Sequence, residues 1–132
     1  MRAHVLAALG GAISVLTAAG AAAAPAPPAP GAPYAAEVRA FAFNFCPQGW
    51  LPADGSLLPI AQNQMLFSLL GTTYGGNGVS TFALPDLRGR APLGAGASVA
   101  LGQVASAQPG SQPRFLGMTW CIAVQGAYPS HG

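Results

Sequence analysis

The chain has 132 residues, and its five basic residues, all arginine, stand against only three acidic ones. Nucleic-acid binding by phosphate neutralisation needs a basic face with many contacts, and the four arginines beyond residue 36 are too scattered to form one. With so few ionisable groups, the chain also has few residues that could act as a catalytic acid or base. Residues 37–132 contain 14 Gly and 8 Pro, which argues against long helices and favours a loop-rich, mostly β domain.

The N-terminal segment 1–23 is predicted to be a signal peptide. A short positive start precedes the uncharged apolar run Val5–Gly20, and small residues follow at the expected cleavage site. We expect cleavage after Ala23, because cleavage after Ala24 would place a proline at the scissile bond. The alternative is an uncleaved membrane anchor, but the run is mostly Ala with several Gly, so its insertion energy is weak. The protein is therefore expected to be secreted or periplasmic, with membrane contact only through an uncleaved leader.

Residues 24–36 are predicted to be an Ala/Pro-rich linker. Pro25–Pro33 reads PAPPAPGAP, a composition typical of an extended and stiff polyproline-type spacer. A proline-rich ligand for a partner protein is the alternative. The remaining residues, 37–132, have the length of one small domain. Its expected fold class is α+β, mainly β, with short strands, extended loops and one short helix.

Two cysteines, Cys46 and Cys121, lie near the two ends of this segment. In an exported chain they are candidates for one disulfide, and closing so long a loop would stabilise the domain by roughly 4 kcal/mol. Two buried free thiols are the alternative. A catalytic cysteine is disfavoured because the only histidine beyond the leader, His131, lies at the C-terminal tail. Two cysteines and one histidine also fall short of the four ligands of a structural zinc site.

Short strands are predicted along the domain from period-two alternation and from bounded apolar runs. The first strand begins at Glu37 and is expected to carry an aromatic face of Phe41, Phe43 and Phe45. The last run, Phe115–Val124, is nearly continuous and is expected to be a central strand buried on both faces. If these two strands pair, the two cysteines come within bonding reach. Further extended segments are predicted at Trp50–Pro52, Leu57–Ile60 and Phe82–Pro85.

One helix is predicted at about 62–70, where apolar residues share one face and Gly71 can end the helix. The members of that face are Met65, Leu66, Leu69 and Leu70, and we interpret them as core packing rather than a ligand groove. The glycine-rich loop that follows lacks the Lys-Ser/Thr of a phosphate-binding loop. Its glycines are interpreted as turn residues with positive φ.

Turn residues carry most of the charge. Asp54-Gly55 is expected to form a tight reversal, because Gly supplies the left-handed backbone geometry. Asp86, Arg88 and Arg90 lie within five residues, and we expect a local cluster of ion pairs and backbone hydrogen bonds. An exposed arginine pair that binds a carboxylate or a sulfate is the alternative.

Several short motifs follow one another along the chain. They are, in order, Glu37-Val38-Arg39-x-Phe41, Phe45-x-Pro47-x-Gly49-Trp50, Asp54-Gly55-x-Leu57-Leu58-Pro59-Ile60, Leu66 to Gly76, Thr81-Phe82-x-Leu84-Pro85-Asp86-Leu87-Arg88-Gly89-Arg90 and Cys121-Ile122-Ala123-x-Gln125-Gly126-x-x-Pro129-Ser130. Together they resemble the phage tail collar domain, in the bacterial branch called microcystin-dependent proteins. This resemblance implies a small mixed β domain with one helix that supports assembly or surface attachment, and it implies no catalytic residues.

Within these motifs, ten residues are expected to have structural roles. They are Trp50, Asp54, Gly55, Gly75, Gly76, Pro85, Asp86, Arg88, Gly89 and Arg90. Three departures from the family pattern matter. Ala53 stands where members often carry Cys, the variable insert has shrunk to about Gly94–Pro113 without any His, and an export signal has been added. The shortened insert puts in doubt a metal-stabilised trimeric receptor tip.

Three functions compete. The first is a non-enzymatic secreted or periplasmic module with a structural or binding role, whose partner would be a protein or a cell-surface glycan. The second is a phage tail or tailocin component whose leader is a misassigned start. The third is a small hydrolase that uses Asp54 and Asp86, which suits glycoside cleavage only if the carboxylates lie some 5–10 Å apart in a cleft. No cofactor, metal or nucleic acid is expected, whereas a homo-oligomer is compatible with the sequence.

Overall fold

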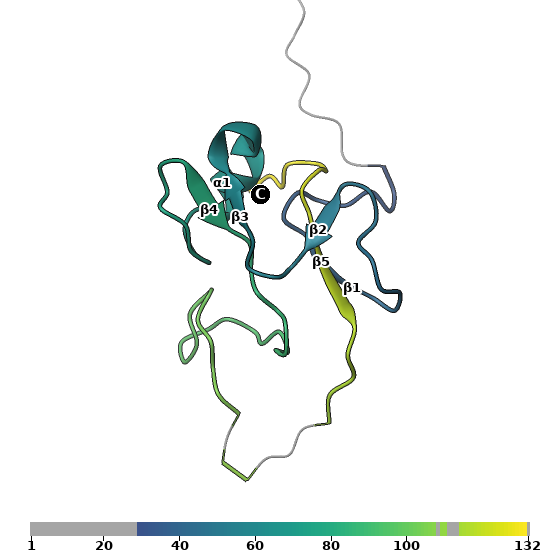
Figure 1. The fold of residues 1–132 in the computed structure, drawn as a ribbon, viewed down its shortest axis with the longest axis vertical. Helices are drawn as coiled ribbons and strands as arrows, with labels where there is room; N and C mark the ends of the chain where they lie inside the picture. The colour runs from purple at the N-terminus through teal and green to yellow at the C-terminus, as the bar shows by residue number, and fades with distance from the viewer. Residues whose placement is uncertain (1–28, 108, 111–113, 132) are drawn as a thin grey trace, which may run out of the picture.

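The structure is a computed structural model that describes residues 29–107, 109–110 and 114–131. The predicted signal peptide 1–23 and the first residues of the predicted linker lie outside this part. The elements in chain order are β1 (Val38–Phe41), β2 (Trp50–Pro52), β3 (Leu57–Pro59), the 3-10 turn η1 (Ile60–Gln62), α1 (Gln64–Leu70), β4 (Thr81–Ala83) and β5 (Thr119–Ala123). The fold is thus a small domain of short antiparallel strands with one short helix, as the sequence predicts (Figure 1).

Strand β5 is the centre of a three-stranded antiparallel sheet of order β1-β5-β2. Cys121, Ile122 and Ala123 follow one another in β5 and are all buried. Successive side chains of a strand point to opposite faces, so both faces of β5 are covered. This confirms a central strand buried on both sides. The predicted strand was too long, however, because Phe115 and Leu116 are exposed and precede the first paired residue, Thr119.

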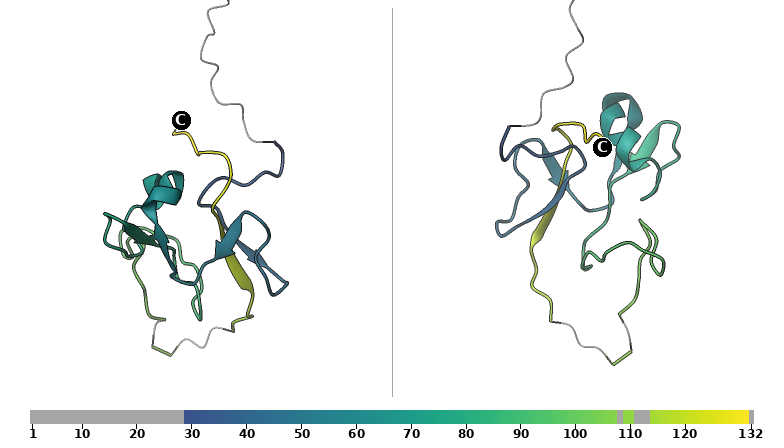
Figure 2. Two further views of the ribbon diagram at one scale, coloured as in Figure 1. Left: turned by 45° about the horizontal axis from the view of Figure 1, so that its top comes forward. Right: turned by 180° about the vertical axis from the view of Figure 1, so that it is seen from behind.

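The second sheet consists of β3 and β4 alone, paired antiparallel from Leu57↔Ala83 to Pro59↔Thr81. Views from two further directions show this pair beside the larger sheet, with α1 above it (Figure 2). The hydrophobic core lies where these parts meet, and it contains Leu66, Phe82, Leu84 and Ile122. One helix and two small sheets therefore share one core, because none of them has enough apolar surface to be stable alone.

Helix α1 is shorter than predicted and packs with a different face. It begins at Gln64 after η1 and ends at Gly71, whose backbone N–H bonds to the Phe67 carbonyl over 2.8 Å. Leu66 is buried, and Phe67 and Leu70 pack beside it. The predicted face was wrong at Met65, which is exposed, because the helix turns Phe67 toward Phe82 instead, with 5.5 Å between the two ring centroids.

Strand β1 ends at Phe41, four residues before the end of the predicted aromatic face. The next residues bend away from β5 and lead to Cys46. Phe43 and Phe45 are 42% and 61% exposed, so the expectation that three phenylalanines form a half-buried strand face was wrong beyond Phe41. Asp54-Gly55 also differs from a simple hairpin, since β2 and β3 belong to different sheets.

The N-terminal and C-terminal parts of the described chain lie side by side. Tyr34 forms an isolated parallel bridge with Ala127, and the Ala35 backbone N–H donates to the Ala127 carbonyl over 2.9 Å. Ala35 is buried, so the packed part of the chain includes residues on the N-terminal side of Glu37. The boundary between linker and domain at 36/37 stays a prediction. Between Arg90 and Met118 the described residues form no helix or strand, and most of them lie away from both sheets (Figure 1).

Among the residues that the structure describes, no helix is long and apolar enough to cross a membrane.

Candidate functional site

Two turns cross at the junction between the sheets. The segment Ala53–Ser56 follows β2, and the segment Leu84–Arg88 follows β4. Asp54 and Asp86 form an isolated antiparallel bridge at the crossing. On either side of it, the Leu87 backbone N–H donates to the Ala53 carbonyl over 2.9 Å, and the Gly55 N–H donates to the Pro85 carbonyl over 3.3 Å. The turns are therefore held together by backbone hydrogen bonds, and the two acidic side chains are brought to one place.

Asp86 is the centre of a charged cluster. Arg88 binds both of its carboxylate oxygens, with Nε 2.9 Å from Oδ1 and Nη2 3.0 Å from Oδ2. The Arg88 backbone N–H also donates to Oδ1 over 3.1 Å. Arg90 Nη1 lies 2.9 Å from the Asp86 carbonyl oxygen and 3.3 Å from Oδ2. The hydrogen bonds from Arg88 hold the pKa of Asp86 well below its usual range, and those from Asp86 raise the pKa of Arg88.

Asp54 is bonded within its own turn. Its Oδ1 accepts hydrogen bonds from the Ser56 hydroxyl and, over 3.0 Å, from the Ser56 backbone N–H. The hydroxyl contact lowers the pKa of Asp54, and the positive charge of Arg88 adds to this effect, although partial burial opposes it. Asp54 is therefore a carboxylate at neutral pH. Its Oδ2 accepts no hydrogen bond from the described residues.

Two glycines permit the close approach of backbones around this junction. Gly55 has φ = +79°, and a Cβ there would lie 3.2 Å from the Cβ of Asp86. Gly76 has φ = +92°, and a Cβ there would lie 2.4 Å from the Cα of Phe82, which is too close for any side chain. Both positions need glycine for reasons of space as well as of backbone conformation.

The other predicted motif residues lie around the same junction or in the adjacent loop. Gly75 accepts a backbone hydrogen bond from Ala83 over 3.0 Å. Pro85 is buried next to the bridge, and Gly89 follows Arg88 with φ = +64°. Trp50 lies elsewhere, in β2 on the larger sheet.

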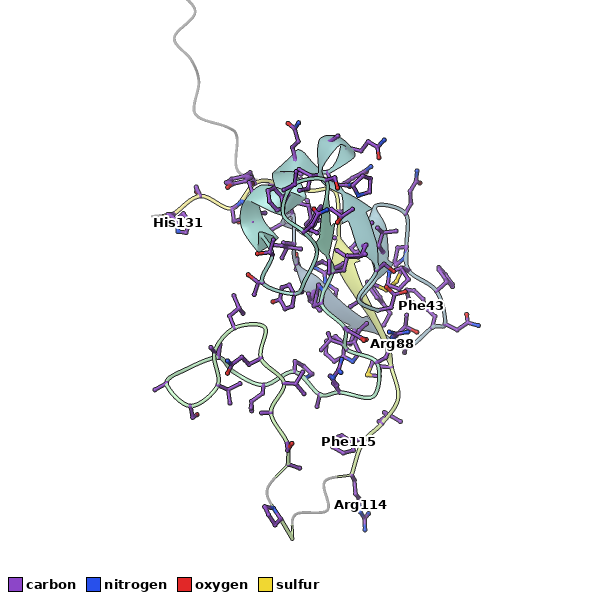
Figure 3. The ribbon with its side chains drawn as sticks, turned by 60° about the vertical axis from the view of Figure 1, so that its left-hand side comes forward. Phe43, Arg88, Arg114, Phe115 and His131 are labelled. Atoms are coloured by element: carbon purple, nitrogen blue, oxygen red, sulfur yellow. A yellow bond between two sulfur atoms is a disulfide. The ribbon has the colours of Figure 1, made fainter. Side chains whose placement is uncertain are left out.

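A pocket of about 360 Å³ opens beside the crossing turns. Its walls come from the end of β2, from the turn after β4 and from the start of β5. Asp54 and Arg88 supply its charged side chains, and Thr119 also borders it. The apolar lining residues are Pro52, Ala53, Leu87, Met118 and Trp120. Arg88 lies near the start of β5 in the side-chain view (Figure 3).

Sequence reasoning missed the contribution of β5 to this pocket. Met118, Thr119 and Trp120 are more than 60 positions from Asp54, and they were interpreted only as part of a buried strand. No local sequence signal marks this contribution, which arises because β2 pairs with β5 and places Pro52 opposite Cys121. The Ala53 backbone N–H then bonds to the Trp120 carbonyl over 2.9 Å.

A disulfide lies on the face of the larger sheet that points away from the core residue Ile122. Cys46 and Cys121 are bonded, with 5.8 Å between their Cα atoms. The predicted pairing of the first and last strands is also present, with Arg39 opposite Cys121. The disulfide ties the loop after β1 to the middle of the central strand. Such a bond is consistent with an oxidising compartment.

A row of contacting side chains extends from β2 across β1 into the loop after β1. The Arg39 guanidinium is 5.1 Å from the ring centre of Trp50, and the Trp50 and Phe41 rings meet edge to face at 5.5 Å. The row continues from Phe41 to Phe43 at 4.9 Å and from Phe43 to Phe45 at 4.6 Å. Arg39 is also paired with Glu37, whose pKa is lowered by that hydrogen bond.

A second hollow, of about 330 Å³, begins where this row meets the start of β5. It is lined by Ala42, Phe43, Asn44, Gly117, Met118 and Thr119. Met118 and Thr119 thus border both hollows. Within the part of the chain that the structure describes, no three His, Cys, Asp or Glu side chains are grouped so that they could hold a metal ion.

Comparison with known proteins gives one family. Residues 36–92 match the family described as Phage Tail Collar Domain. No curated protein matches the chain, and no solved structure matches it. The matched range contains β1 to β4, α1 and both turns of the Asp54–Asp86 crossing, whereas β5 and Cys121 lie beyond it. Residues 36–92 of this chain are therefore a phage tail collar domain.

Proposed function

We propose that this protein is an exported, non-enzymatic module in which a tail collar domain serves as a rigid support for binding another macromolecule. The collar domain over 36–92 is the observation that carries the proposal. The disulfide between Cys46 and Cys121 supports the exported location, because such bonds persist in oxidising compartments. Secretion or periplasmic residence through cleavage of 1–23 is the finer part of the proposal.

The bonding of the acidic residues supports a non-enzymatic role. Glu37, Asp54 and Asp86 each bond to an arginine or to a turn backbone, and the pKa of each is lowered. A general acid at neutral pH needs a raised pKa, as in glycosidases. The hydrolase hypothesis that uses Asp54 and Asp86 is therefore disfavoured. Turnover of a glycoside that is abolished by Asp54→Asn would restore it.

Exposed apolar side chains support a binding role. Around the disulfide face and the chain that leads into β5, five large apolar residues are at least 42% exposed: Phe43, Phe45, Phe115, Leu116 and Met118. Monomeric soluble proteins rarely expose contiguous apolar patches of more than a few hundred Å², and larger patches mark interaction sites. A partner protein, a surface glycan or a second copy of the chain are the partners to distinguish.

A phage tail or tailocin component is the second candidate function. The same collar domain favours it, since the family takes its name from phage tails. In this case the protein would copurify with tail particles, and its N-terminal residues would not be removed.

The test uses the full chain expressed in a bacterium. Cell fractionation and N-terminal sequencing should recover the protein outside the cytoplasm, starting at Ala24. The recovered protein should bind isolated cell envelopes, and size analysis under oxidising and reducing conditions should give its oligomeric state. Recovery of an unprocessed chain only in the cytosol, or only in tail particles, would overturn the exported module and favour the second candidate.

A further inference from the structure

The pocket beside the crossing turns combines apolar walls with unused polar atoms. Its volume of about 360 Å³ lies at the lower end of the range for small-ligand sites, which are mostly apolar with a few well-placed polar groups. Trp120 and Met118 provide the apolar surface. Asp54 and Arg88 provide the polar groups. A small ligand with one apolar side and several hydroxyl groups would match this lining.

The polar atoms left for a ligand include both acceptors and donors. The Oδ1 atom of Asp54 accepts hydrogen bonds from Ser56 within the turn, whereas Oδ2 has no partner among the described residues. Arg88 uses Nε and Nη2 for Asp86, and its Nη1 is likewise without a partner in the described part. Thr119 pairs with Phe41 and Trp120 with Ala40, so the Thr119 side chain lies on the other face of β5 and is not counted among these atoms. A carboxylate beside a guanidinium can bind two neighbouring hydroxyl groups, one as acceptor and one as donor.

The charge of this junction sums to zero. Asp54 and Asp86 carry two negative charges, and Arg88 and Arg90 carry two positive ones. Both arginines are already paired with Asp86, at 2.9 Å and 3.3 Å. An anionic ligand would have to compete with Asp86 for Arg88, and a cationic ligand would face Arg88 itself. The alternative of a carboxylate or sulfate site is therefore disfavoured, and an uncharged ligand fits better.

We propose that this pocket binds an uncharged sugar ring, whose C–H side packs on Trp120 and Met118 and whose hydroxyl groups bond to Asp54 and Arg88. The face of an indole ring carries negative partial charge and attracts the weakly positive C–H groups of a pyranose. The inference rests on the proposed function, because it names the class of surface molecule that the module would bind: a neutral glycan.

The experiment is a titration of the ¹⁵N-labelled, oxidised full chain, followed by NMR. The probes are methyl glycosides of glucose, galactose, mannose and N-acetylglucosamine, with glucuronic acid and glucosamine as charged versions of one ring. At least one neutral glycoside should shift the Trp120 indole signal saturably. The Trp50 indole should not shift, because Trp50 lies away from the pocket under Arg39. The two charged sugars should bind more weakly than methyl glucoside.

Conservative variants give a second measurement. Asp54→Asn keeps an oxygen for Ser56 but replaces the Oδ2 acceptor, and it should weaken binding about fivefold to tenfold, the loss expected for one hydrogen bond. Glu37→Gln makes the same change of an acid to its amide outside the pocket and should leave binding unchanged. Amide spectra of both variants establish that they fold.

The inference is overturned if no neutral glycoside shifts the Trp120 indole, if a charged sugar binds more tightly, or if Asp54→Asn and Glu37→Gln behave alike. Envelope binding by the same preparation separates this failure from failure of the proposed function. A chain that binds envelopes but no sugar retains its binding role and loses this pocket as the site. A chain that binds sugar but remains in the cytosol retains the pocket and loses the exported role.

Discussion

Asp54 lies opposite Asp86 in an antiparallel bridge, yet each carboxylate bonds within its own turn rather than across the bridge. Like charges directly opposite each other on paired strands are destabilising. Here the cost is offset because Arg88 lies close enough to lower the pKa of both. The arginines therefore act as counterions that allow two acidic turns to cross.

Acid should destabilise the domain through these groups. Ordinary pKa values are 4.5 for Glu37 and 3.8 for Asp54 and Asp86, and all three are lowered in the folded state. As the pH falls below about 4.5, the unfolded chain takes up protons first. The stabilisation present above this pH is then lost as the pH approaches the folded pKa values. Urea unfolding between pH 7 and pH 2 should show this fall, and Asp86→Asn should make it shallower. Stability that rises on acidification would contradict the assignment.

Reduction of the disulfide should destabilise the domain. The bond closes a loop of 75 residues, so its loss should lower the free energy of unfolding by about 4 kcal/mol in the chain-entropy model. Urea unfolding with and without dithiothreitol measures this difference. The double variant Cys46→Ser/Cys121→Ser serves as the control, since the reductant should have no effect on it.

The same substitution should destabilise the domain more at a phenylalanine of the hydrophobic core than at one of the exposed aromatic row. Phe82 is fully buried and contacts Phe67, so Phe82→Ala should cost about 3–5 kcal/mol. Phe43 is 42% exposed, and Phe43→Ala should cost about 1 kcal/mol or less, mainly from its aromatic neighbours. Thermal or urea unfolding tests both variants, and equal losses would mean that Phe43 belongs to the core.

The same substitution at two glycines should distinguish a position where two backbones lie close together from a position in an open loop. At Gly76 a methyl group would overlap the Phe82 backbone at positive φ, so Gly76→Ala should destabilise by more than about 1 kcal/mol. At Gly94 nothing lies within 4 Å of the added carbon. Gly94→Ala should be neutral or slightly stabilising, and unfolding midpoints of the two variants give the comparison.

The sequence predicted those parts of the fold whose pattern is local. Trp50–Pro52, Leu57–Pro59 and the helix before Gly71 could be read from alternation, apolar spacing and a C-terminal glycine. The position of β5 could also be predicted, because a nearly continuous apolar run around Cys121 and Ile122 is typical of a strand buried on both sides.

The ends of the helices and strands, and the contacts between residues far apart in the sequence, could not be predicted from local patterns. Phe43 and Phe45 continue the alternation of β1, but the strand ends at Phe41 and the chain then leads to Cys46, which is bonded to Cys121 of the central strand. The pocket was missed for a related reason. Its walls at Asp54 and Trp120 are joined only by strand pairing, and no local pattern in either segment predicts their meeting.

The bridge between Tyr34 and Ala127 makes the two ends of strand β5 different. Whatever is joined to the N-terminal side enters where β5 finishes, whereas the two hollows border Met118 and Thr119, where β5 starts. A tether attached at the Tyr34 end would leave both hollows at the far end of β5, away from the point of attachment. Fusing a bulky protein at the N-terminus should therefore leave both hollows open to large surfaces.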